Sequence, residues 1–81
     1  MQTFFVSLSS ISDVKKFVDA ATRCACEVDV LSGRYVINAK SIMGLFGLDL
    51  NAPIVMRTEG EGEELAAFLK EVGKYIVETQ D

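Results

Sequence analysis

Four groups of residues in the sequence carry side chains that could do chemistry. They are the serines around residue 10, Ser41, the Cys24–Cys26 pair and the acidic run Glu61–Glu64. Hydroxyls and thiols act as nucleophiles when a base stands beside them, and thiolates or carboxylates can hold metal ions. The chain contains no histidine, which excludes Ser-His-Asp and Cys-His catalysis, histidine-ligated zinc and phosphohistidine. Ser10 or Ser12 as a nucleophile lacks a base, so we expect no enzyme.

The cysteines and the acidic run do not predict a metal or cofactor site. A disulfide between Cys24 and Cys26 would close a small, strained ring, and a zinc site needs about four ligands. Two small buried residues in a reducing cytoplasm are favoured, with a redox role as the alternative. Glu61, Glu63 and Glu64 suit the start of a helix, where the dipole favours acid.

Length and charge restrict the kind of protein. At 81 residues and 8.9 kDa, residues 1–81 form a single domain. The net charge of −4 argues against nucleic acid, because phosphate binding depends on Lys and Arg. Apolar runs are too short for a membrane span, and no basic segment indicates a secretory signal. We therefore expect a cytoplasmic protein with protein partners.

Hydrophobic periodicity predicts four strands and three helices. Alternation favours strands over 3–8, 26–30, 34–39 and 54–58, the middle two joined by a turn at Ser32–Gly33. Ser12 is the expected N-cap of a helix that ends near Arg23, and a longer helix follows the acidic run to about Val77. A short helix spans about 40–47 and is closed by Gly47. The order β-α-β-β-α-β-α predicts an α+β two-layer, open-faced sandwich, with a mostly antiparallel four-stranded sheet and three helices on one face.

The short helix contains more apolar residues than one buried stripe requires. Leu45, with Leu48 or Leu50, can supply its core contacts, so some of Ile42, Met43 and Phe46 should stay exposed. An exposed apolar patch usually marks a binding site, although all three could belong to the core. Four cations, Lys15, Lys16, Arg23 and Lys40, either contact an acidic partner or form a solvated face.

The stretch from Asn38 to Gly47, with the element order and length, resembles HPr, the histidine phosphocarrier of the bacterial sugar phosphotransferase system. The run Lys40-Ser41-Ile42-Met43-Gly44 is similar to the regulatory-serine motif of HPr proteins from low-GC Gram-positive bacteria. The Phe17-Val18 pair and the exit of the last predicted strand also fall at HPr-like spacings. The similarity spans about Phe4 to Val77.

One segment departs from the family. HPr proteins carry their histidine in a Gly-x-His-x-Arg-Pro segment, where this chain has Ser9-Ser10-Ile11-Ser12-Asp13. The lost histidine site corresponds to Ser10 or Ile11, and both assignments stay open. A serine hydroxyl is a poorer nucleophile than imidazole, and Asp13 repels anionic phosphoryl donors. We therefore expect a chain without phosphocarrier activity.

The resemblance implies a regulatory function. Ser41 would be phosphorylated by HPr kinase/phosphorylase, although a helix N-cap alone also explains a serine there. The helix residues Ile42, Met43 and Phe46, with Lys40, would contact that kinase, phosphotransferase components or a catabolite-control repressor. The leading hypothesis is a regulatory module in carbohydrate uptake or carbon catabolite control. The alternative is a stand-alone interaction protein on the same fold, without a link to the phosphotransferase system.

Overall fold

The computed structural model describes residues 2–80, and their side chains as far as residue 77. The elements are β1 (Gln2–Val6), α1 (Ile11–Arg23), β2 (Val28–Ser32), β3 (Tyr35–Asn38), α2 (Ile42–Phe46), β4 (Ile54–Thr58), α3 (Gly62–Val72), a 3-10 turn (Gly73–Tyr75) and β5 (Ile76–Gln80).

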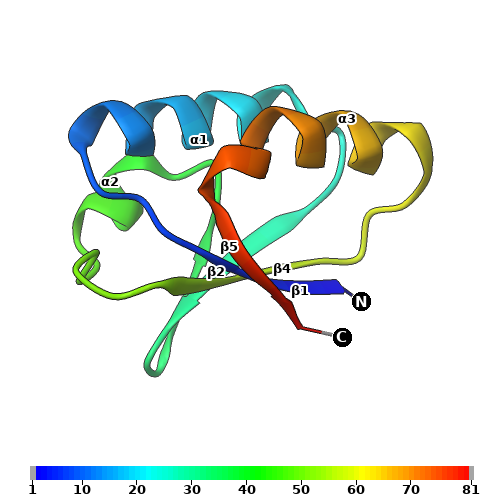
Figure 1. The fold of residues 1–81 in the computed structure, drawn as a ribbon. Coiled ribbons are helices and arrows are strands. Elements are labelled where there is room, and N and C mark those ends of the chain that lie inside the picture. Colours follow the sequence, from blue (N-terminus) through cyan, green and yellow to red (C-terminus); the bar gives the residue numbers. More distant parts are fainter. Residues whose placement is uncertain (1, 81) are drawn as a thin grey trace.

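The strands form one antiparallel sheet in the order β3-β2-β4-β1-β5. Helices α1 and α3 lie side by side over one face of this sheet, and α2 covers one end of the same face (Figure 1). Within residues 2–80 the opposite face of the sheet carries no helix (Figure 1), and the predicted α+β two-layer sandwich is confirmed.

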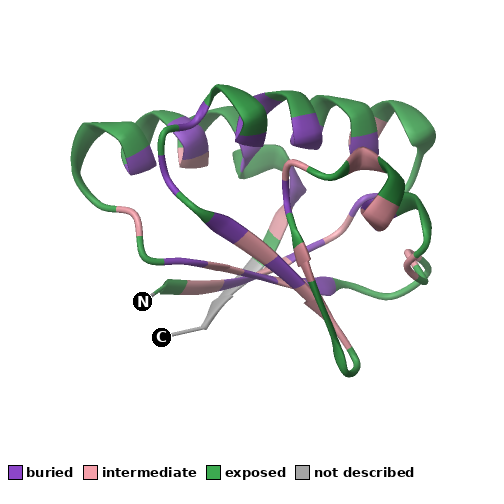
Figure 2. Cartoon of the chain, turned by 180° about the vertical axis from the view of Figure 1, so that it is seen from behind, coloured by how far each residue is buried: buried purple, intermediate pink, exposed green. Residues whose placement is uncertain are grey.

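The core lies between the sheet and the helices. Alternate residues of β1, β2 and β4 are buried, as the period of two requires for strands with one covered face (Figure 2). The rings of Phe17 on α1 and Phe68 on α3 meet edge to face, with centroids 6.2 Å apart. This contact holds the two long helices together above the sheet.

The sheet has five strands rather than the predicted four. The last predicted helix ends at Val72, and a 3-10 turn then leads into β5, which pairs with β1. Ile76 and Val77 lie in this strand, so the predicted continuation of the helix to Val77 is wrong. Glycine is a poor helix former, and Gly73 stands where the helix ends.

Three local boundaries also differ from the prediction. The N-cap of α1 is Ser10 rather than Ser12. Cys26 precedes β2, which begins at Val28. The hairpin turn consists of Gly33 and Arg34, and Gly33 has the positive φ of 59° that such a tight turn needs.

Candidate functional site

Hydrogen bonds within the chain occupy the start of α1, where the family places its histidine. The Ser10 Oγ accepts a hydrogen bond from the Asp13 backbone N–H at 3.0 Å. The Asp13 carboxylate accepts bonds from the backbone N–H and the hydroxyl of Ser9, at 3.1 and 3.0 Å. These two bonds are the main reason why the pKa of Asp13 lies below its ordinary value. The segment therefore presents a fixed negative charge, which opposes the approach of another anion.

A shallow pocket connects this segment to the end of α2. It has a volume of about 210 Å³ and is lined by Leu8, Ser9, Ser10, Ile11, Val14, Phe46, Leu50 and Asn51. Ile11 is 66% exposed and Phe46 is 40% exposed. The structure thus brings together the predicted site of the lost histidine and one of the predicted partner-binding residues, as a mostly apolar surface. Ser12 is exposed on α1 but does not line this pocket.

Ser41 is the N-cap of α2, as its residue type predicts. Its Oγ accepts a hydrogen bond from the Gly44 backbone N–H at 3.2 Å, and the residue is exposed. Lys40 is half-buried, and its backbone N–H donates to Asn38 Oδ1 at 2.8 Å. The Ser41 hydroxyl therefore has a structural function and is also open to solvent.

The three predicted apolar contact residues of α2 do not behave alike. Met43 is 77% exposed and Phe46 is exposed, whereas Ile42 is half-buried and packs against the core. Met43 lines a second pocket of about 340 Å³ together with Tyr35, Ile37, Gly44, Gly47 and Leu48. The sequence assigned no function to Tyr35, because a single tyrosine in a predicted strand gives no sign of a neighbouring helix.

The two cysteines are buried and their thiols are free. Burial is the main cause that raises the pKa of the Cys26 thiol, and the neighbouring Cys24 adds to the effect. The thiol form is therefore favoured, which makes Cys26 a weak nucleophile and a poor metal ligand at neutral pH. Within residues 2–77, no group of three or more Cys, Asp or Glu side chains converges as a metal site would require.

The predicted cations differ in whether they form ion pairs within the protein. Arg23 forms ion pairs with Asp19, at 3.0 Å, and with Glu71 of α3, whereas Lys15 and Lys16 are exposed on α1.

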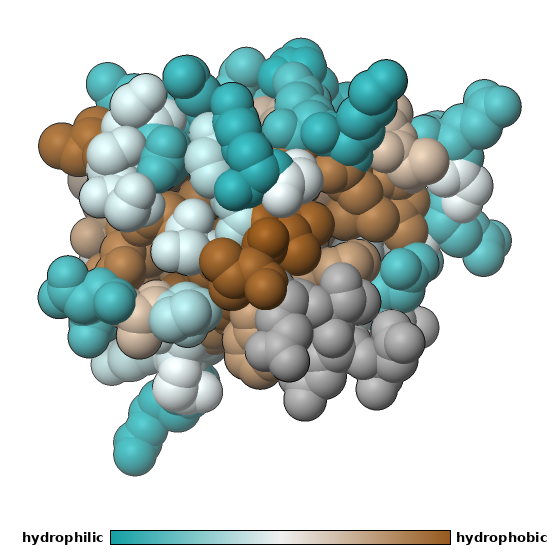
Figure 3. Space-filling view, viewed as in Figure 1, coloured by the Kyte–Doolittle hydropathy of each residue, from teal (hydrophilic) through white to brown (hydrophobic). Residues whose placement is uncertain are grey.

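Polar side chains cover the helical layer, and apolar residues appear beneath it (Figure 3). The acidic residues Glu63 and Glu64 lie in the first turn of α3, as their charge predicts. No helix in the described part of the chain has the length and apolar character needed to cross a membrane.

Both the sequence and the fold are similar to those of known proteins. A family model described as the PTS HPr component phosphorylation site matches residues 13–77. The structure is similar to that of HPr-C-His from Thermoanaerobacter tengcongensis, with a TM-score of 0.69 and 20% sequence identity. That match covers 91% of this chain and 93% of the other, and at this identity it shows a shared fold. A search of curated proteins gives no significant match. The matched family residues include Ser41 and all of α2, whereas Ser10, Ile11 and Ser12 precede them.

Proposed function

The chain belongs to the HPr family of the phosphotransferase system, and we propose that it is a regulatory, protein-binding member rather than a phosphate carrier. In this proposal the protein acts in the bacterial cytoplasm, through Ser41 and α2, in the control of carbohydrate uptake or carbon catabolite repression. It is not an enzyme, and its partners are HPr kinase/phosphorylase, a catabolite-control repressor or components of the phosphotransferase system.

The absence of histidine from the sequence supports the loss of carrier function. A carrier needs a nitrogen nucleophile that accepts a phosphoryl group and passes it on. At the start of α1 the hydroxyls of Ser9 and Ser10 are hydrogen-bonded to Asp13, whose pKa is lowered. The residues that remain there are therefore suited to close the helix end rather than to transfer phosphate.

One observation carries the proposal: an exposed, helix-capping Ser41 stands on the same short helix as the exposed side chains of Met43 and Phe46. A phosphate on Ser41 would add about −1.5 to −2 charge beside these apolar groups. The positive end of the helix and the neighbouring Lys40 would favour that charge. Phosphorylation could therefore change which partner binds α2 while the fold stays intact.

Labelling with HPr kinase/phosphorylase and ATP tests the regulatory part of the proposal. We expect one phosphate per chain in the wild type, none in Ser41→Ala, and wild-type labelling in Ser12→Ala. Ser12 is the matched control because it is also exposed near a helix start. If the wild type takes up no phosphate, or if Ser41→Ala is still labelled, the regulatory function of Ser41 is wrong.

Binding assays test the surface itself. We expect Met43→Asp and Phe46→Asp to weaken binding to the purified kinase, whereas Val77→Asp leaves binding unchanged. Val77 is an exposed apolar residue on β5, outside the α2 surface. Equal binding by all three variants would show that α2 is not part of the interface.

Incubation with enzyme I, phosphoenolpyruvate and a IIA domain tests the loss of carrier activity, and onward transfer of phosphate would refute it.

A further inference from the structure

Strand β3 forms one edge of the sheet, because within the described chain it pairs only with β2. The Ala39 backbone N–H donates to the Val28 carbonyl at 2.9 Å. This bond identifies the residues of β3 whose backbone N–H and C=O groups point toward β2. Since hydrogen-bonded pairs alternate along an antiparallel ladder, Ile37 bonds to Val30. The backbone groups of Val36 and Asn38 therefore point away from the sheet.

Part of this outward-facing backbone is already used. The Asn38 carbonyl accepts a hydrogen bond from the Ser41 N–H at 2.9 Å, so the chain turns into α2 there. Among residues 2–80, no hydrogen bond occupies the N–H and C=O of Val36 or the N–H of Asn38, so these groups are available for another strand. An exposed edge of this kind can pair with an extended chain.

The 340 Å³ pocket lies directly beside this edge, on the helix-covered side of the sheet. Its walls are Tyr35 and Ile37 of β3, Met43 of α2 and Leu48. Gly44 of the same wall lies tightly against Ile37, because a Cβ at residue 44 would come within 2.7 Å of the Ile37 Cγ2, so the missing side chain lets the helix approach the strand closely below the pocket. In strand addition, backbone bonds supply affinity and a pocket for alternate side chains supplies specificity. Both components are present here, and they involve different atoms.

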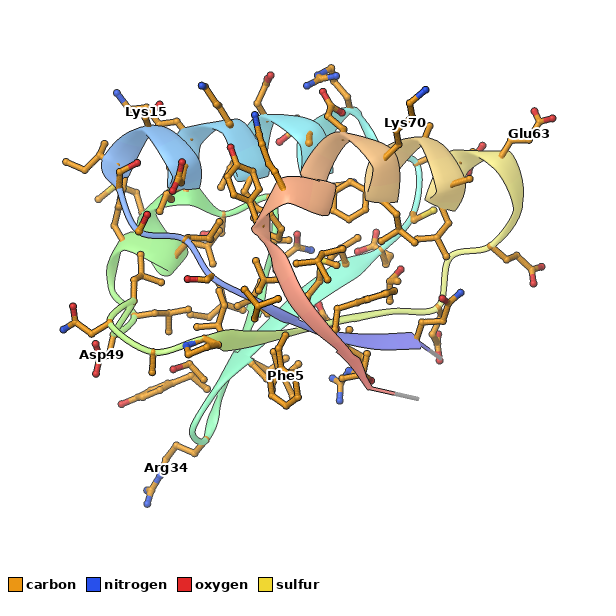
Figure 4. The ribbon with its side chains drawn as sticks, viewed as in Figure 1. Phe5, Lys15, Arg34, Asp49, Glu63 and Lys70 are labelled. Atoms are coloured by element: carbon orange, nitrogen blue, oxygen red, sulfur yellow. The ribbon has the colours of Figure 1, made fainter. Side chains whose placement is uncertain are left out.

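The two ends of β3 carry positive charge, although the whole chain has a net charge of −4. Arg34 precedes the strand at the tip of the hairpin (Figure 4), and Lys40 follows the strand in the sequence. Within residues 2–77, neither side chain takes part in an ion pair. This charge arrangement favours an acidic segment over a neutral or basic one.

The same charges disfavour a second copy of the chain as the occupant. Antiparallel pairing of two β3 strands would bring Arg34 of one copy near Lys40 of the other. Like charges placed opposite each other destabilise a strand pair. Each copy also carries the net charge of −4, which adds repulsion.

We propose that the β3 edge binds an extended acidic peptide segment of another protein by strand addition. The backbone of this segment pairs with Val36 and Asn38, and a large aliphatic side chain enters the pocket between Tyr35 and Met43. Acidic residues at its two ends meet Arg34 and Lys40. This interaction goes beyond the function proposed for Ser41, since it does not require phosphorylation or the Phe46 side of α2.

A synthetic peptide provides the probe. It has a central leucine, flanking valines and threonines, two glutamates at each end and a fluorescein label. We expect saturable fluorescence anisotropy below about 1 mM protein, which corresponds to weak binding. In a ¹⁵N-labelled sample, amide shifts should concentrate at residues 34–38, and hydrogen exchange at Val36 and Asn38 should slow. The same peptide with lysines in place of the glutamates should bind more weakly.

Two variants separate the edge from the charges. Val36→Pro removes an outward N–H without removing a bond to β2, and proline is accepted on edge strands. It should weaken binding roughly tenfold or more, since a backbone bond and its neighbours are lost. Arg34→Glu should weaken it about two- to fivefold, as expected for an exposed charge. Lys70→Glu is the charge-matched control on the helical layer (Figure 4) and should bind like the wild type.

The outcomes are decisive in both directions. Circular dichroism of Val36→Pro establishes that it folds, and Arg34→Glu gives an independent reading if it does not. Equal binding by wild type and Arg34→Glu, shifts centred on β5, or no binding would overturn the proposal. Concentration-dependent dimerisation through β3 would also overturn it. Phe46→Asp should keep peptide binding while it loses kinase binding, so the two proposals can fail independently of each other.

Discussion

The carboxylate of Asp13 accepts two hydrogen bonds from one residue, Ser9, through its backbone N–H at 3.1 Å and its hydroxyl at 3.0 Å. The backbone bond first, and the hydroxyl bond second, lower the pKa of Asp13 from its ordinary value of 3.8. A carboxyl whose folded pKa is lowered stabilises the fold above the unfolded pKa and loses that effect as the pH falls through the folded pKa.

Asp13→Asn should therefore have a lower melting temperature than the wild type at pH 7. The difference should shrink as the pH falls from 3.8 through the lowered pKa of folded Asp13, because below that pKa residue 13 is uncharged in both proteins. Thermal unfolding between pH 2 and pH 7 measures this. Glu59→Gln is the control, because Glu59 is exposed and forms no ion pair among the described side chains. Parallel curves for Asp13→Asn and wild type would contradict the prediction.

Thr58 connects the end of β4 to the loop before β2. The residue is only 2% exposed. Its hydroxyl donates a hydrogen bond to the Glu27 carbonyl at 2.8 Å and accepts one from the Gly60 N–H at 3.0 Å. Thr58→Val keeps the shape but leaves two backbone groups without this partner. We expect a loss of about 1–3 kcal/mol in unfolding free energy, measured by urea denaturation. Thr58→Ser keeps the hydroxyl and should lose about 0.8 kcal/mol for the missing methyl. Equal losses would argue against the hydrogen bonds.

Gly60 lies directly against Cys26. A Cβ at residue 60 would clash with the Cys26 Sγ, which is the nearest atom, and with the Cys26 Cβ at 2.6 Å, so Gly60→Ala should cost about 1–3 kcal/mol. Cys26→Gly should remove both clashes in the double variant, whereas Cys26→Ala removes only the clash with the sulfur and should recover a smaller part of the loss. Gly73→Ala is the control, since a Cβ there meets nothing within 4 Å. Urea denaturation of this set measures the losses, and equal recovery by Cys26→Ala and Cys26→Gly would show that the Cys26 Cβ does not contribute to the conflict.

The Ser41 hydroxyl caps α2 through the Gly44 N–H. Ser41→Ala should lower the unfolding free energy by about 0.5–2 kcal/mol, whereas Ser41→Asp keeps a good N-cap and should stay close to wild type. Ser12→Ala, in the first turn of α1 but not its cap, should change stability by less than about 0.5 kcal/mol. This series measures the structural function of Ser41 apart from any modification. No loss in Ser41→Ala would show that the cap is energetically unimportant.

Much of the fold could be predicted from periodicity, because most strands bury one face and both long helices bury one stripe. The fifth strand could not, since Ile76 continues the helical spacing of Leu65, Leu69 and Val72. Only Gly73 indicated an end to that helix, and glycine inside a helical pattern is an ambiguous signal. The correct N-cap was also present as Ser10 three residues before Asp13, but Ser12 competed with it. Local propensity alone does not rank two such serines.

The candidate site was predicted in part. Ser41, Met43 and Phe46 are exposed, as a helix too apolar for one buried stripe requires. That Phe46 shares a pocket with Ile11, and Met43 with Tyr35, depends on tertiary packing between distant segments. No spacing along the chain contains that information. Ile42 packs against the core, so α2 contacts the rest of the protein through Ile42 as well as through Leu45.

The antiparallel pairing of β1 with β5 places Thr3 opposite Gln80, so the outer ends of these two strands lie together at one side of the sheet (Figure 1). A short linker could join them, and new ends could then be opened at the exposed Gly33–Arg34 turn. The architecture is therefore suited to circular permutation, and equally to insertion as a compact cassette within a loop of a host protein.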